Sequence, residues 1–372
     1  MALLDQRDFV QASAHSDHQP EIKRSLRILV IATEAPPVRG GIARIVGYLR
    51  DGLQERGHHT DVMAYPEVGR LVFGEVRLSS LIFKLPHLLR RMNEYDVVHI
   101  HGTTPTISDL SLLLISFCHP RPLVIYTHHV DLDFQAARFL NGIYNFVHHQ
   151  LSARADATIA ATSDTLNLLG TIRKGYVIPY GIDLAQFRSE GAKDEQFTVL
   201  FIGQFRPWKG VDVLLRAMSQ VTNARLIVAG QGAEEKAYRL LAAERGLDCE
   251  FHISVSDDQL HVLYQRAHVV IVPSVSRLEA FGLALVEGMA AGCIPIASDL
   301  PGVCEVVGHS GFLFPQGDAD ALAVILRNLR DHPERVQQLG ADARLRSGEF
   351  DRASTIREYE RVMIELKACR EK

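Results

Sequence analysis

Short apolar runs that alternate with helical patterns limit the fold of this chain more than any other feature of the sequence. The first run, at residues 26–32, consists almost entirely of Leu, Ile, Val and Ala, as in parallel strands that are buried on both faces. Similar runs follow at 97–101, 123–126, 157–160 and 176–178, with helical stretches between them. Strands that alternate with helices predict a parallel sheet that is covered by helices on both faces.

The same pattern starts again after a polar segment at residues 188–196. Separated by further helical patterns, new apolar runs follow at 197–203, 225–229, 250–253, 269–272 and 294–297. The sequence therefore predicts an α/β protein with two doubly wound, Rossmann-like parallel-sheet domains. A chain of 372 residues is long enough for two such domains.

The predicted order along the chain has four segments. Residues 1–24 are polar and without periodicity, which predicts a flexible N-terminal tail. The two domains are expected at 25–187 and 188–345. Residues 346–372 carry apolar side chains at helical spacing and predict a C-terminal helix that packs back towards the first domain.

The charges and the cysteines narrow the partners and the compartment. With 40 basic and 44 acidic residues, the net charge of −4 argues against binding to nucleic acid. Five cysteines without C-x-x-C spacing fit a reducing compartment and argue against a structural zinc site. The first residues do not resemble a signal peptide, and no apolar run approaches the roughly 20 residues of a membrane helix. We therefore expect a cytoplasmic protein.

Residues 70–91 combine positive charge with apolar side chains. Five cations stand against a single acid, Glu75, and many of the residues between them are Leu, Ile, Val or Phe. A basic amphipathic segment can rest on an anionic lipid surface, which would bring the protein to the inner face of the plasma membrane. The alternative is a helix that faces the core and leaves its basic side in water. Both interpretations stay open.

Two loops that follow the first strand of each half can bind an anion. Gly40 and Gly41 lie between the first strand and a helix, where paired glycines let backbone amides approach an anion or form only a tight turn. Their spacing is not G-x-G-x-x-G, which disfavours an NAD-dependent oxidoreductase. In the second half, Arg206 and Lys209 can hold a diphosphate and stabilise it as it leaves, unless both are simply solvated.

The segment from Glu279 to Glu287 indicates function most strongly. Two glutamates flank an apolar, glycine-containing stretch that passes from a loop into a helix. Carboxylates in such surroundings are costly without partners, so a pair of surface glutamates is the weaker interpretation. Amides near Gly282 can face a phosphate, and a carboxylate such as Glu287 can accept hydrogen bonds from both hydroxyls of a ribose.

This segment resembles the E-x7-E signature of the retaining glycosyltransferase family 4, or glycosyl transferases group 1, whose members have the GT-B fold. Residues 273–298 around it are similar to the longer family pattern. Further pieces follow in the family's order: PPVRGGIARIV (36–46), DVVHIHG (96–102), YTHHVD (126–131), VIPYGID (177–183), KGVDVLLRA (209–217) and VAGQG (228–232). The resemblance extends from about residue 26 to 345 and implies two domains that face a central cleft.

The resemblance implies a hexosyltransferase that uses a nucleotide diphosphate sugar, either GDP-mannose or a UDP-hexose. The acceptor hydroxyl would belong to a lipid-linked saccharide, a lipid or a small molecule, in polysaccharide or glycolipid biosynthesis. The first domain would lie on the acceptor side and the second would bind the donor. The anomeric configuration would be retained by transfer on the same face, with the leaving diphosphate helping to deprotonate the acceptor.

Roles for individual residues follow from the same resemblance. Arg206 and Lys209 would bind the diphosphate, Glu279 the sugar hydroxyls and Glu287 the ribose. His129, in the pattern T-x-H-x-D, would lie beside the transferred sugar. The implied catalytic residues are His129, Glu279, Arg206 and Lys209. The implied donor-binding residues are Gly40, Gly41, Arg206, Lys209, Glu279, Phe281, Gly282, Leu283 and Glu287.

Some positions depart from the family pattern. Gln204 stands where Arg is frequent, so Arg206 is expected to supply that charge. Tyr180 replaces a frequent Asn and Gly288 a frequent Ala, and both are expected to tune the fit of nucleotide or acceptor. His99 and His101 match an H-x-H pattern of the family and are expected to be mainly structural.

Metal and cofactors are not expected. Asp131 and Asp133 match the D-x-D of metal-dependent transferases with another fold, but here they belong to the T-x-H-x-D element. GT-B enzymes generally bind the diphosphate without a metal. Two alternatives to a transferase stay open: a GT-B-fold epimerase that acts on sugar nucleotides, and a non-catalytic member that binds a nucleotide sugar.

Overall fold

The computed structural model describes residues 25–38, 40–64, 70–73, 76–79, 85–103, 107–133, 138–188 and 191–372. The chain divides into two compact units. Unit 1 comprises the chain up to Gly181 together with Arg352–Lys372, and unit 2 comprises Ile182–Asp351. The chain passes between them after Gly181, earlier than the expected boundary after residue 187, so that α7 (Leu184–Phe187) belongs to unit 2. The predicted tail at 1–24 lies outside the described residues.

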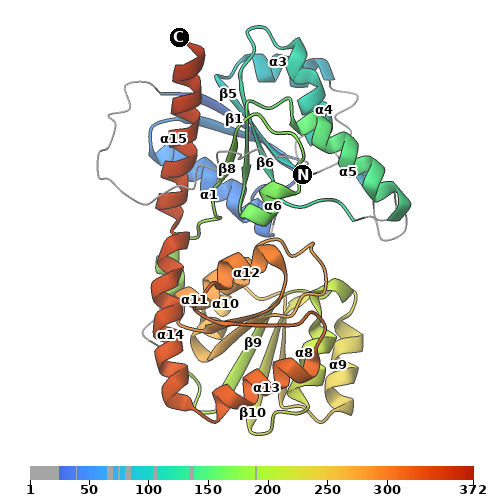
Figure 1. Cartoon of the computed structure of the whole chain (residues 1–372), viewed down its shortest axis with the longest axis vertical. Helices are drawn as coiled ribbons and strands as arrows, with labels where there is room; N and C mark the ends of the chain where they lie inside the picture. The colour runs from blue at the N-terminus through green and yellow to red at the C-terminus, as the bar shows by residue number, and fades with distance from the viewer. Residues whose placement is uncertain are drawn as a thin grey trace, which may run out of the picture. The chain divides into compact units, whose positions relative to one another are not determined.

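Unit 1 is built on a parallel sheet with the strand order β2-β1-β5-β6-β7-β8, as the alternating pattern predicted (Figure 1). Its strands are β1 (Arg27–Ile31), β2 (His59–Met63), β5 (Val97–Gly102), β6 (Leu123–His128), β7 (Ala157–Ala160) and β8 (Gly175–Val177). Its helices are α1 (Gly41–Glu55), α3 (Leu85–Asn93), α4 (Ser108–Leu114), the 3-10 turn η2 (Ile115–Phe117), α5 (Arg138–Ser152), α6 (Ser163–Asn167) and α15 (Arg352–Arg370).

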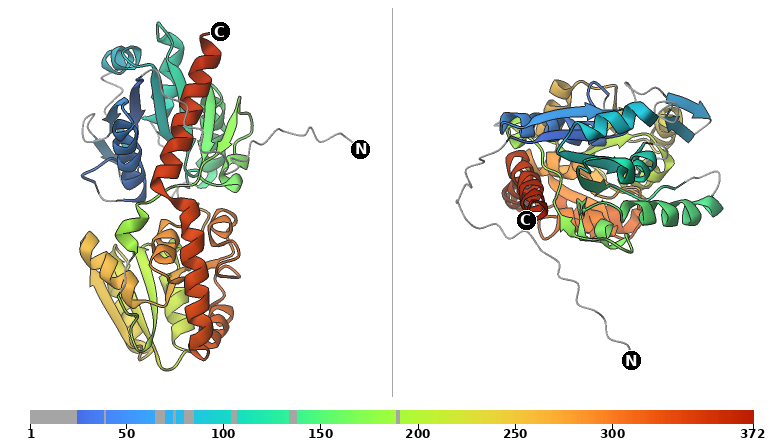
Figure 2. Two further views of the ribbon diagram at one scale, coloured as in Figure 1. Left: turned by 90° about the vertical axis from the view of Figure 1, so that its left-hand side faces the viewer. Right: turned by 90° about the horizontal axis from the view of Figure 1, so that it is seen from above.

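Alternate residues of the strands serve two separate hydrophobic cores. Ile28 and Val30 of β1 face a core that is shared with α1 and α15. Leu29 and Ile31 face the opposite core, to which α3 and α4 contribute. The continuous apolar run at the start of the chain is therefore a strand buried on both faces. The turned view shows α15 lying along unit 1 (Figure 2).

The C-terminal helix α15 is fixed to α1 and the turn after it by a charged cluster. Arg56 Nε donates to Glu360 Oε2 at 2.5 Å, and His58 Nε2 lies 2.9 Å from Glu360 Oε1. Glu360 is buried, with 4% of its surface exposed. Close packing continues beside this cluster, because a β-carbon on Gly52 would lie 2.6 Å from Ile356 Cγ1. The last 21 residues thus complete unit 1 although unit 2 precedes them in sequence.

Residues 70–91 do not form one amphipathic helix. The backbone at Arg70–Phe73 (β3) and Val76–Ser79 (β4) forms an antiparallel pair of strands, and helix α3 begins only at Leu85. The side chains of residues 70–84 lie outside what the structure describes. Among the described residues, no helix is both long and apolar enough to cross a bilayer.

Unit 2 repeats the same architecture with the strand order β11-β10-β9-β12-β13-β14. Its strands are β9 (Phe197–Gln204), β10 (Ala224–Gln231), β11 (Cys249–Ile253), β12 (Val269–Val272), β13 (Ile294–Ser298) and β14 (Phe312–Phe314). Its helices are α7, the 3-10 turn η4 (Pro207–Lys209), α8 (Val211–Met218), α9 (Glu235–Glu244), α10 (Asp257–Arg266), α11 (Leu283–Ala290), α12 (Pro301–Val307), α13 (Ala319–Arg330), α14 (Pro333–Ser347) and the turn η5 (Gly348–Phe350).

Helices cover both faces of the second sheet as well. Side chains of α8, α9 and α13 share one core with alternate strand residues such as Phe201 and Ile271. Helix α11 lies on the opposite face against Val270, where a β-carbon on Gly288 would come within 2.4 Å of Val270 Cγ1. This close approach accounts for the glycine at position 288 by packing rather than by ligand fit.

The Glu360 cluster predicts how the C-terminal helix stabilises unit 1. Glu360→Ala should lower the free energy of unfolding by about 1–3 kcal/mol, because buried His58 loses its carboxylate partner. Glu365→Ala on the same helix is the matched control and should stay within about 0.5 kcal/mol, since its side chain is 51% exposed. Urea unfolding of both full-length variants measures the difference. Equal losses would show that the cluster does not hold α15.

Candidate functional site

The predicted donor-binding residues of unit 2 follow two neighbouring strands. Strand β9 pairs with β10 on one side and β12 on the other, so the order of the strands reverses at β9. Ligands of open parallel sheets bind beyond the carboxyl ends of strands at such a point. The loop with Arg206 and Lys209 follows β9, and the segment that begins at Glu279 follows β12.

An ion pair joins these two segments. Lys209 Nζ donates to Glu279 Oε2 at 2.5 Å, and the Ser274 hydroxyl donates to the same oxygen at 3.1 Å. The side chains of Lys209 and Glu279 keep 17% and 11% of their surface exposed, so the pair is largely but not fully buried. The Lys209 ammonium also lies 4.5 Å from the centre of the Trp208 ring. The sequence predicted both charges but not their contact.

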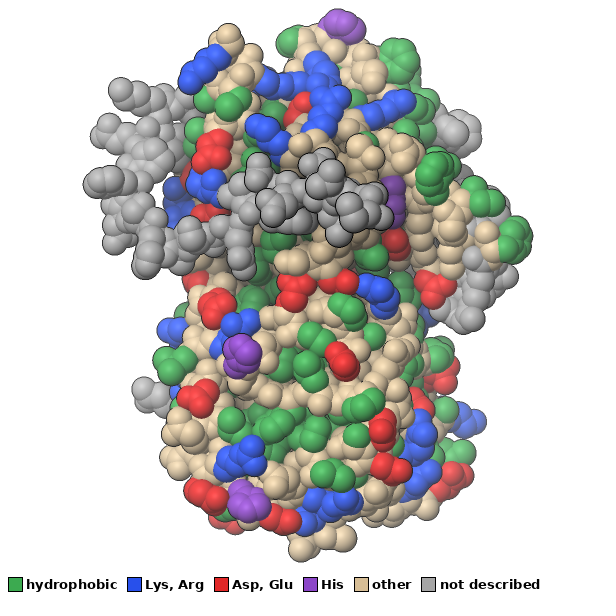
Figure 3. All heavy atoms as spheres, in the orientation of Figure 1, with side chains coloured by type: hydrophobic (Ala, Val, Ile, Leu, Met, Phe, Trp, Pro, Cys, Tyr) green, Lys and Arg blue, Asp and Glu red, His purple; other side chains and the backbone are tan. Residues whose placement is uncertain are grey.

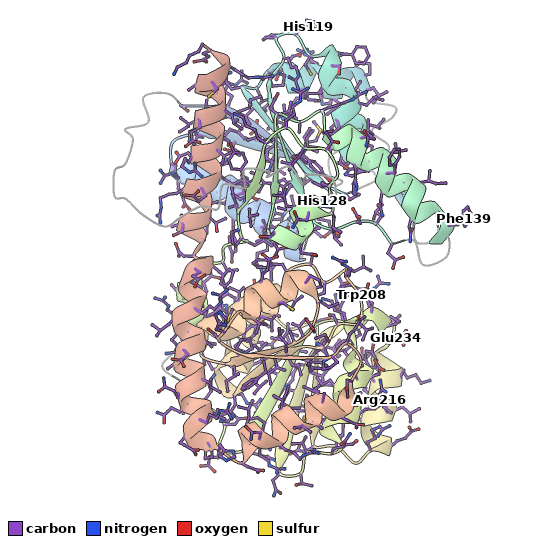
Figure 4. The ribbon with its side chains drawn as sticks, viewed as in Figure 1. His119, His128, Phe139, Trp208, Arg216 and Glu234 are labelled. Carbon is purple, nitrogen blue, oxygen red and sulfur yellow. The ribbon has the colours of Figure 1, made fainter. Side chains whose placement is uncertain are left out.

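Close backbone packing sets the position of Lys209. Gly210 has a φ of 67°, and a β-carbon there would lie 1.9 Å from the carbonyl oxygen of Pro273. The Val275 amide donates to the Trp208 carbonyl at 2.8 Å. Only glycine tolerates both the left-handed conformation and this approach, so the loop rests directly on the segment after β12. Trp208 lies in this loop (Figure 4).

Arg206 differs from Lys209 in its surroundings. Its side chain is exposed, and within the described part of the chain its guanidinium makes no ion pair. The Arg206 carbonyl accepts from the Tyr238 hydroxyl at 3.2 Å, which fixes the backbone and leaves the side chain outside the packed loop. Gln204, at the end of β9, is exposed as well. Of the two predicted cations, only Lys209 is therefore held in place by the protein.

The second glutamate lies apart from the ion pair. Helix α11 begins at Leu283 after Gly282, which has a φ of 78° and supplies no side-chain cap to the first amides. Phe281 is buried and its ring meets Phe350 edge-on at 5.8 Å. Glu287 is 3% exposed and its Oε2 accepts from the Tyr264 hydroxyl at 2.6 Å. The apolar surroundings predicted for this carboxylate are present, and its hydrogen-bonded partner is a tyrosine of α10.

In unit 1, Gly40 and Gly41 begin α1 as expected. Gly40 is the N-terminal cap and offers no side chain to the first amides, and no acidic residue occupies the first turn. Glu34 limits the space here, because a β-carbon on Gly40 would lie 3.0 Å from its Oε2. Arg39 lies outside the described residues. The first turn of α1 therefore presents backbone amides that no side chain of the helix caps.

His129 follows β6 and is packed among aromatic side chains. It is 7% exposed, its Nε2 lies 3.1 Å from His101 Nδ1, and its Nδ1 shares a hydrogen bond with the Tyr180 hydroxyl. The rings of His101 and His129 are stacked with their centres 5.2 Å apart. Tyr180, which replaces a frequent Asn, thus holds the histidine that the resemblance placed beside the sugar.

Burial keeps this histidine cluster uncharged. Burial, with a smaller contribution from the His128 ring, lowers the pKa of His129 to about 3. Burial and the nearby His129 ring lower the pKa of His99 to about 3 as well, and the pKa of His101 lies well below its usual value for the same reasons. A neutral His129 can exchange hydrogen bonds with an uncharged hydroxyl, but it supplies no positive charge near neutral pH.

Sequence reasoning did not predict three contacts: Ser274 with Glu279, Tyr264 with Glu287, and His101 with His129. Ser274 lies two residues after the end of β12, so the rule that ligands gather at the carboxyl ends of strands could have selected it. Tyr264 and His101 belong to elements far away in sequence from Glu287 and His129. No spacing indicates that they meet their partners, because tertiary packing alone brings them together.

The D-x-D pair does not act as one unit. Asp133 Oδ1 accepts from the Asn141 amide at 2.8 Å, whereas Asp131 Oδ1 lies 2.8 Å from His149 Nε2. Among the described residues, one group has the composition of a metal site, and it consists of His128, Asp131 and His149. Asp133 is not part of it.

The low pKa values make stability depend on pH. A histidine whose folded pKa lies below its unfolded value of about 6.5 takes up a proton only in the unfolded state between these two values. Unfolding should therefore become easier as the pH falls from about 6.5 towards 3. His129→Gln and His99→Gln should each reduce this dependence by about 1.1 kcal/mol per pH unit on average, measured by urea unfolding between pH 6.5 and 5. Wild-type slopes in both variants would contradict the assignment.

Two family models together cover most of the chain. The model described as Glycosyltransferase Family 4 matches residues 39–186, and the model described as Glycosyl transferases group 1 matches residues 183–346. Their junction lies close to the passage between the two units after Gly181.

Curated relatives and solved structures agree with these matches. The O-antigen chain mannosyltransferase C of Escherichia coli is 26% identical, over 87% of this chain and 94% of the relative. The phosphatidyl-myo-inositol mannosyltransferase of Mycolicibacterium smegmatis is 28% identical, over 88% of each. A sucrose-phosphate synthase structure from Thermosynechococcus elongatus has a TM-score of 0.77 at 22% identity, over 92% of this chain and all of that one. The chain therefore belongs to glycosyltransferase family 4 and is a glycosyltransferase with the GT-B fold.

Proposed function

We propose that this glycosyltransferase moves mannose from GDP-mannose to a hydroxyl of a lipid-linked acceptor, with retention of the anomeric configuration. The observation that carries the proposal is the contact of Lys209, Glu279 and Ser274 at the carboxyl ends of β9 and β12. It places a cation suited to a diphosphate beside a carboxylate suited to sugar hydroxyls.

The diphosphate would bind to Lys209, with exposed Arg206 turning towards it. Amides at the start of α11, which Gly282 leaves without a side-chain cap, would add further donors next to Phe281 and Leu283. These groups would stabilise the negative charge that develops on the leaving diphosphate, which is the usual way in which such donors lower a barrier.

The ribose would bind to Glu287. Its buried carboxylate already accepts a hydrogen bond from Tyr264, so its orientation is set before the nucleotide arrives. Two ribose hydroxyls can donate to a carboxylate at once. Glu279, nearer to the diphosphate-binding lysine, would hold hydroxyls of the transferred sugar.

Unit 1 would act on the transferred sugar and the acceptor. Amides of the first turn of α1, at Gly40 and Gly41, suit the diphosphate side of the donor. Neutral His129 suits a sugar hydroxyl. In this proposal Glu279 and Glu287 bind hydroxyls of the sugar and of the ribose, and neither is assigned the role of a nucleophile. We therefore propose transfer on one face: the bond between the anomeric carbon and the diphosphate breaks, the acceptor oxygen bonds to that carbon, and the leaving diphosphate takes the acceptor's proton.

The names of the relatives support the donor and the acceptor. One relative, from Xanthomonas oryzae, is called GDP-mannose:cellobiosyl-diphosphopolyprenol alpha-mannosyltransferase and is 32% identical over 63% of this chain and 64% of its own length. On unit 1, large apolar side chains are exposed on α5, among them Phe139, Ile143 and Phe146, and they offer a surface suited to a lipid (Figure 3). Contact of residues 70–91 with a membrane stays a prediction.

A donor and acceptor panel tests the proposal. Full-length protein is incubated with GDP-mannose, GDP-glucose or UDP-glucose and with lipid-linked saccharides, and free nucleotide and glycosylated lipid are measured. We expect acceptor-dependent release of GDP and an α-mannosylated lipid. Interconversion of the donor without nucleotide release would indicate an epimerase. A raised melting temperature with every donor but no turnover would indicate a non-catalytic binding protein.

The ribose role of Glu287 can be tested separately. Glu287→Gln removes the negative charge and turns one acceptor oxygen into a donor amide. One charge-assisted hydrogen bond of roughly 1.5–3 kcal/mol is lost and the other is weakened, so kcat/KM for the donor should fall about 10–10³-fold. Glu244→Gln, an exposed glutamate on α9 of the same unit, is the matched control and should retain wild-type kinetics. A wild-type rate in Glu287→Gln would contradict the assignment.

A further inference from the structure

A second group of polar side chains lies on the other side of the β6 terminus from the His101 and Tyr180 contacts. Successive strand residues point to opposite faces, and His128 accordingly turns away from the partners of His129. It meets Asp131, from the loop after β6, and His149, from α5. Nitrogen and oxygen atoms of the three side chains all lie within 4.8 Å of one another. His128 lies inside unit 1, far from His119 at the edge (Figure 4).

The three side chains converge on one point. Asp131 Oδ1 lies 2.8 Å from His149 Nε2 and 3.2 Å from His128 Nε2. His128 is fully buried, yet its Nε2 makes no hydrogen bond of normal geometry with any residue that the structure describes. A buried ring nitrogen without such a bond is costly, and an ion between the three side chains would satisfy it.

The opposite nitrogen of His128 is held in place. Its Nδ1 lies 3.0 Å from the Tyr126 hydroxyl and 3.2 Å from the Thr103 hydroxyl. The Tyr126 hydroxyl also lies 2.5 Å from His148 Nε2, and His148 Nδ1 lies 2.5 Å from Asp109. Histidines that bind metals are usually oriented through their second nitrogen in this way.

We propose that His128, Asp131 and His149 bind one divalent transition-metal ion, for which Zn²⁺ is the best fit. Two imidazoles and one carboxylate are a zinc-type ligand set that leaves a coordination position open. The side chains of His149 and Asp131 keep 15% and 29% of their surface exposed, which gives the ion a route of entry. The ion would link His149 of α5 to Asp131, which lies in the loop after β6, two residues after His129. This departs from the expectation of no metal, and it uses only one residue of the D-x-D pair.

Metal titration of the full-length protein without a polyhistidine tag tests the proposal. After treatment with a chelator, Co²⁺ is added as a spectroscopic probe and Zn²⁺ as its competitor. We expect one Co²⁺ per chain with the visible absorption of a four-coordinate ion, displaced by one equivalent of Zn²⁺. Zn²⁺ should also raise the melting temperature. Absence of stoichiometric binding would overturn the proposal, whatever the variants show.

Variants identify the ligands. His149→Gln and Asp131→Asn should each weaken Co²⁺ binding by more than about 100-fold, because each removes a ligand. Tyr126→Phe removes only a hydrogen bond that orients the ligand His128 and should weaken binding by about 10–100-fold. His119→Gln, an exposed histidine elsewhere in unit 1, is the matched control and should bind as wild type. Circular dichroism checks that each variant is folded. Wild-type affinity in folded His149→Gln and Asp131→Asn would show that the three side chains form only a hydrogen-bonded cluster.

Discussion

The ion pair between Lys209 and Glu279 is the contact on which the candidate site of unit 2 depends. It joins the segments that follow β9 and β12, at the point where the order of the strands reverses. Gly210 and Pro273 bring the two backbones close enough for this contact. Without a ligand the two charges satisfy each other, so a donor that binds at the proposed site would have to compete for Lys209. The diphosphate would then replace part of an existing interaction instead of ordering a loose loop.

In unit 1, the candidate site is organised at the end of β6, where the side chains of two adjacent histidines contact different groups of residues. His129 meets His101 and Tyr180, whereas His128 meets Tyr126, Asp131 and the histidines of α5. His129 and a metal ion held by His128 would therefore have different partners, although the two histidines are adjacent in sequence. The position of α5 would connect the proposed ion to the apolar surface of that helix.

Much of the fold follows from the sequence, since continuous apolar runs identify the central strands and their alternation with helices identifies the parallel sheets. Two of the edge strands were missed, because β2 (HTDVM) is polar and β14 has only three residues. The structure passes from unit 1 to unit 2 after Gly181, a few residues before the expected boundary, because α7 packs with α10 and α11 of unit 2. The sequence alone identifies Glu287 as a candidate, because apolar residues surround it in the chain. Tyr264 and His149 are identified only by their contacts in the folded structure, which bring distant elements together.

The most direct test of this proposed competition for Lys209 is the affinity for free GDP. Calorimetry measures it for the wild type, Glu279→Gln and Lys209→Met. GDP has no transferred sugar, so in the free nucleotide complex Glu279 acts only as a competitor. Glu279→Gln should therefore bind GDP about fivefold more tightly, equivalent to about 1 kcal/mol, while Lys209→Met binds it more weakly. Lys236→Met, an exposed lysine of α9, serves as the control. Weaker GDP binding by Glu279→Gln, or unchanged binding by Lys209→Met, would contradict the proposed diphosphate site.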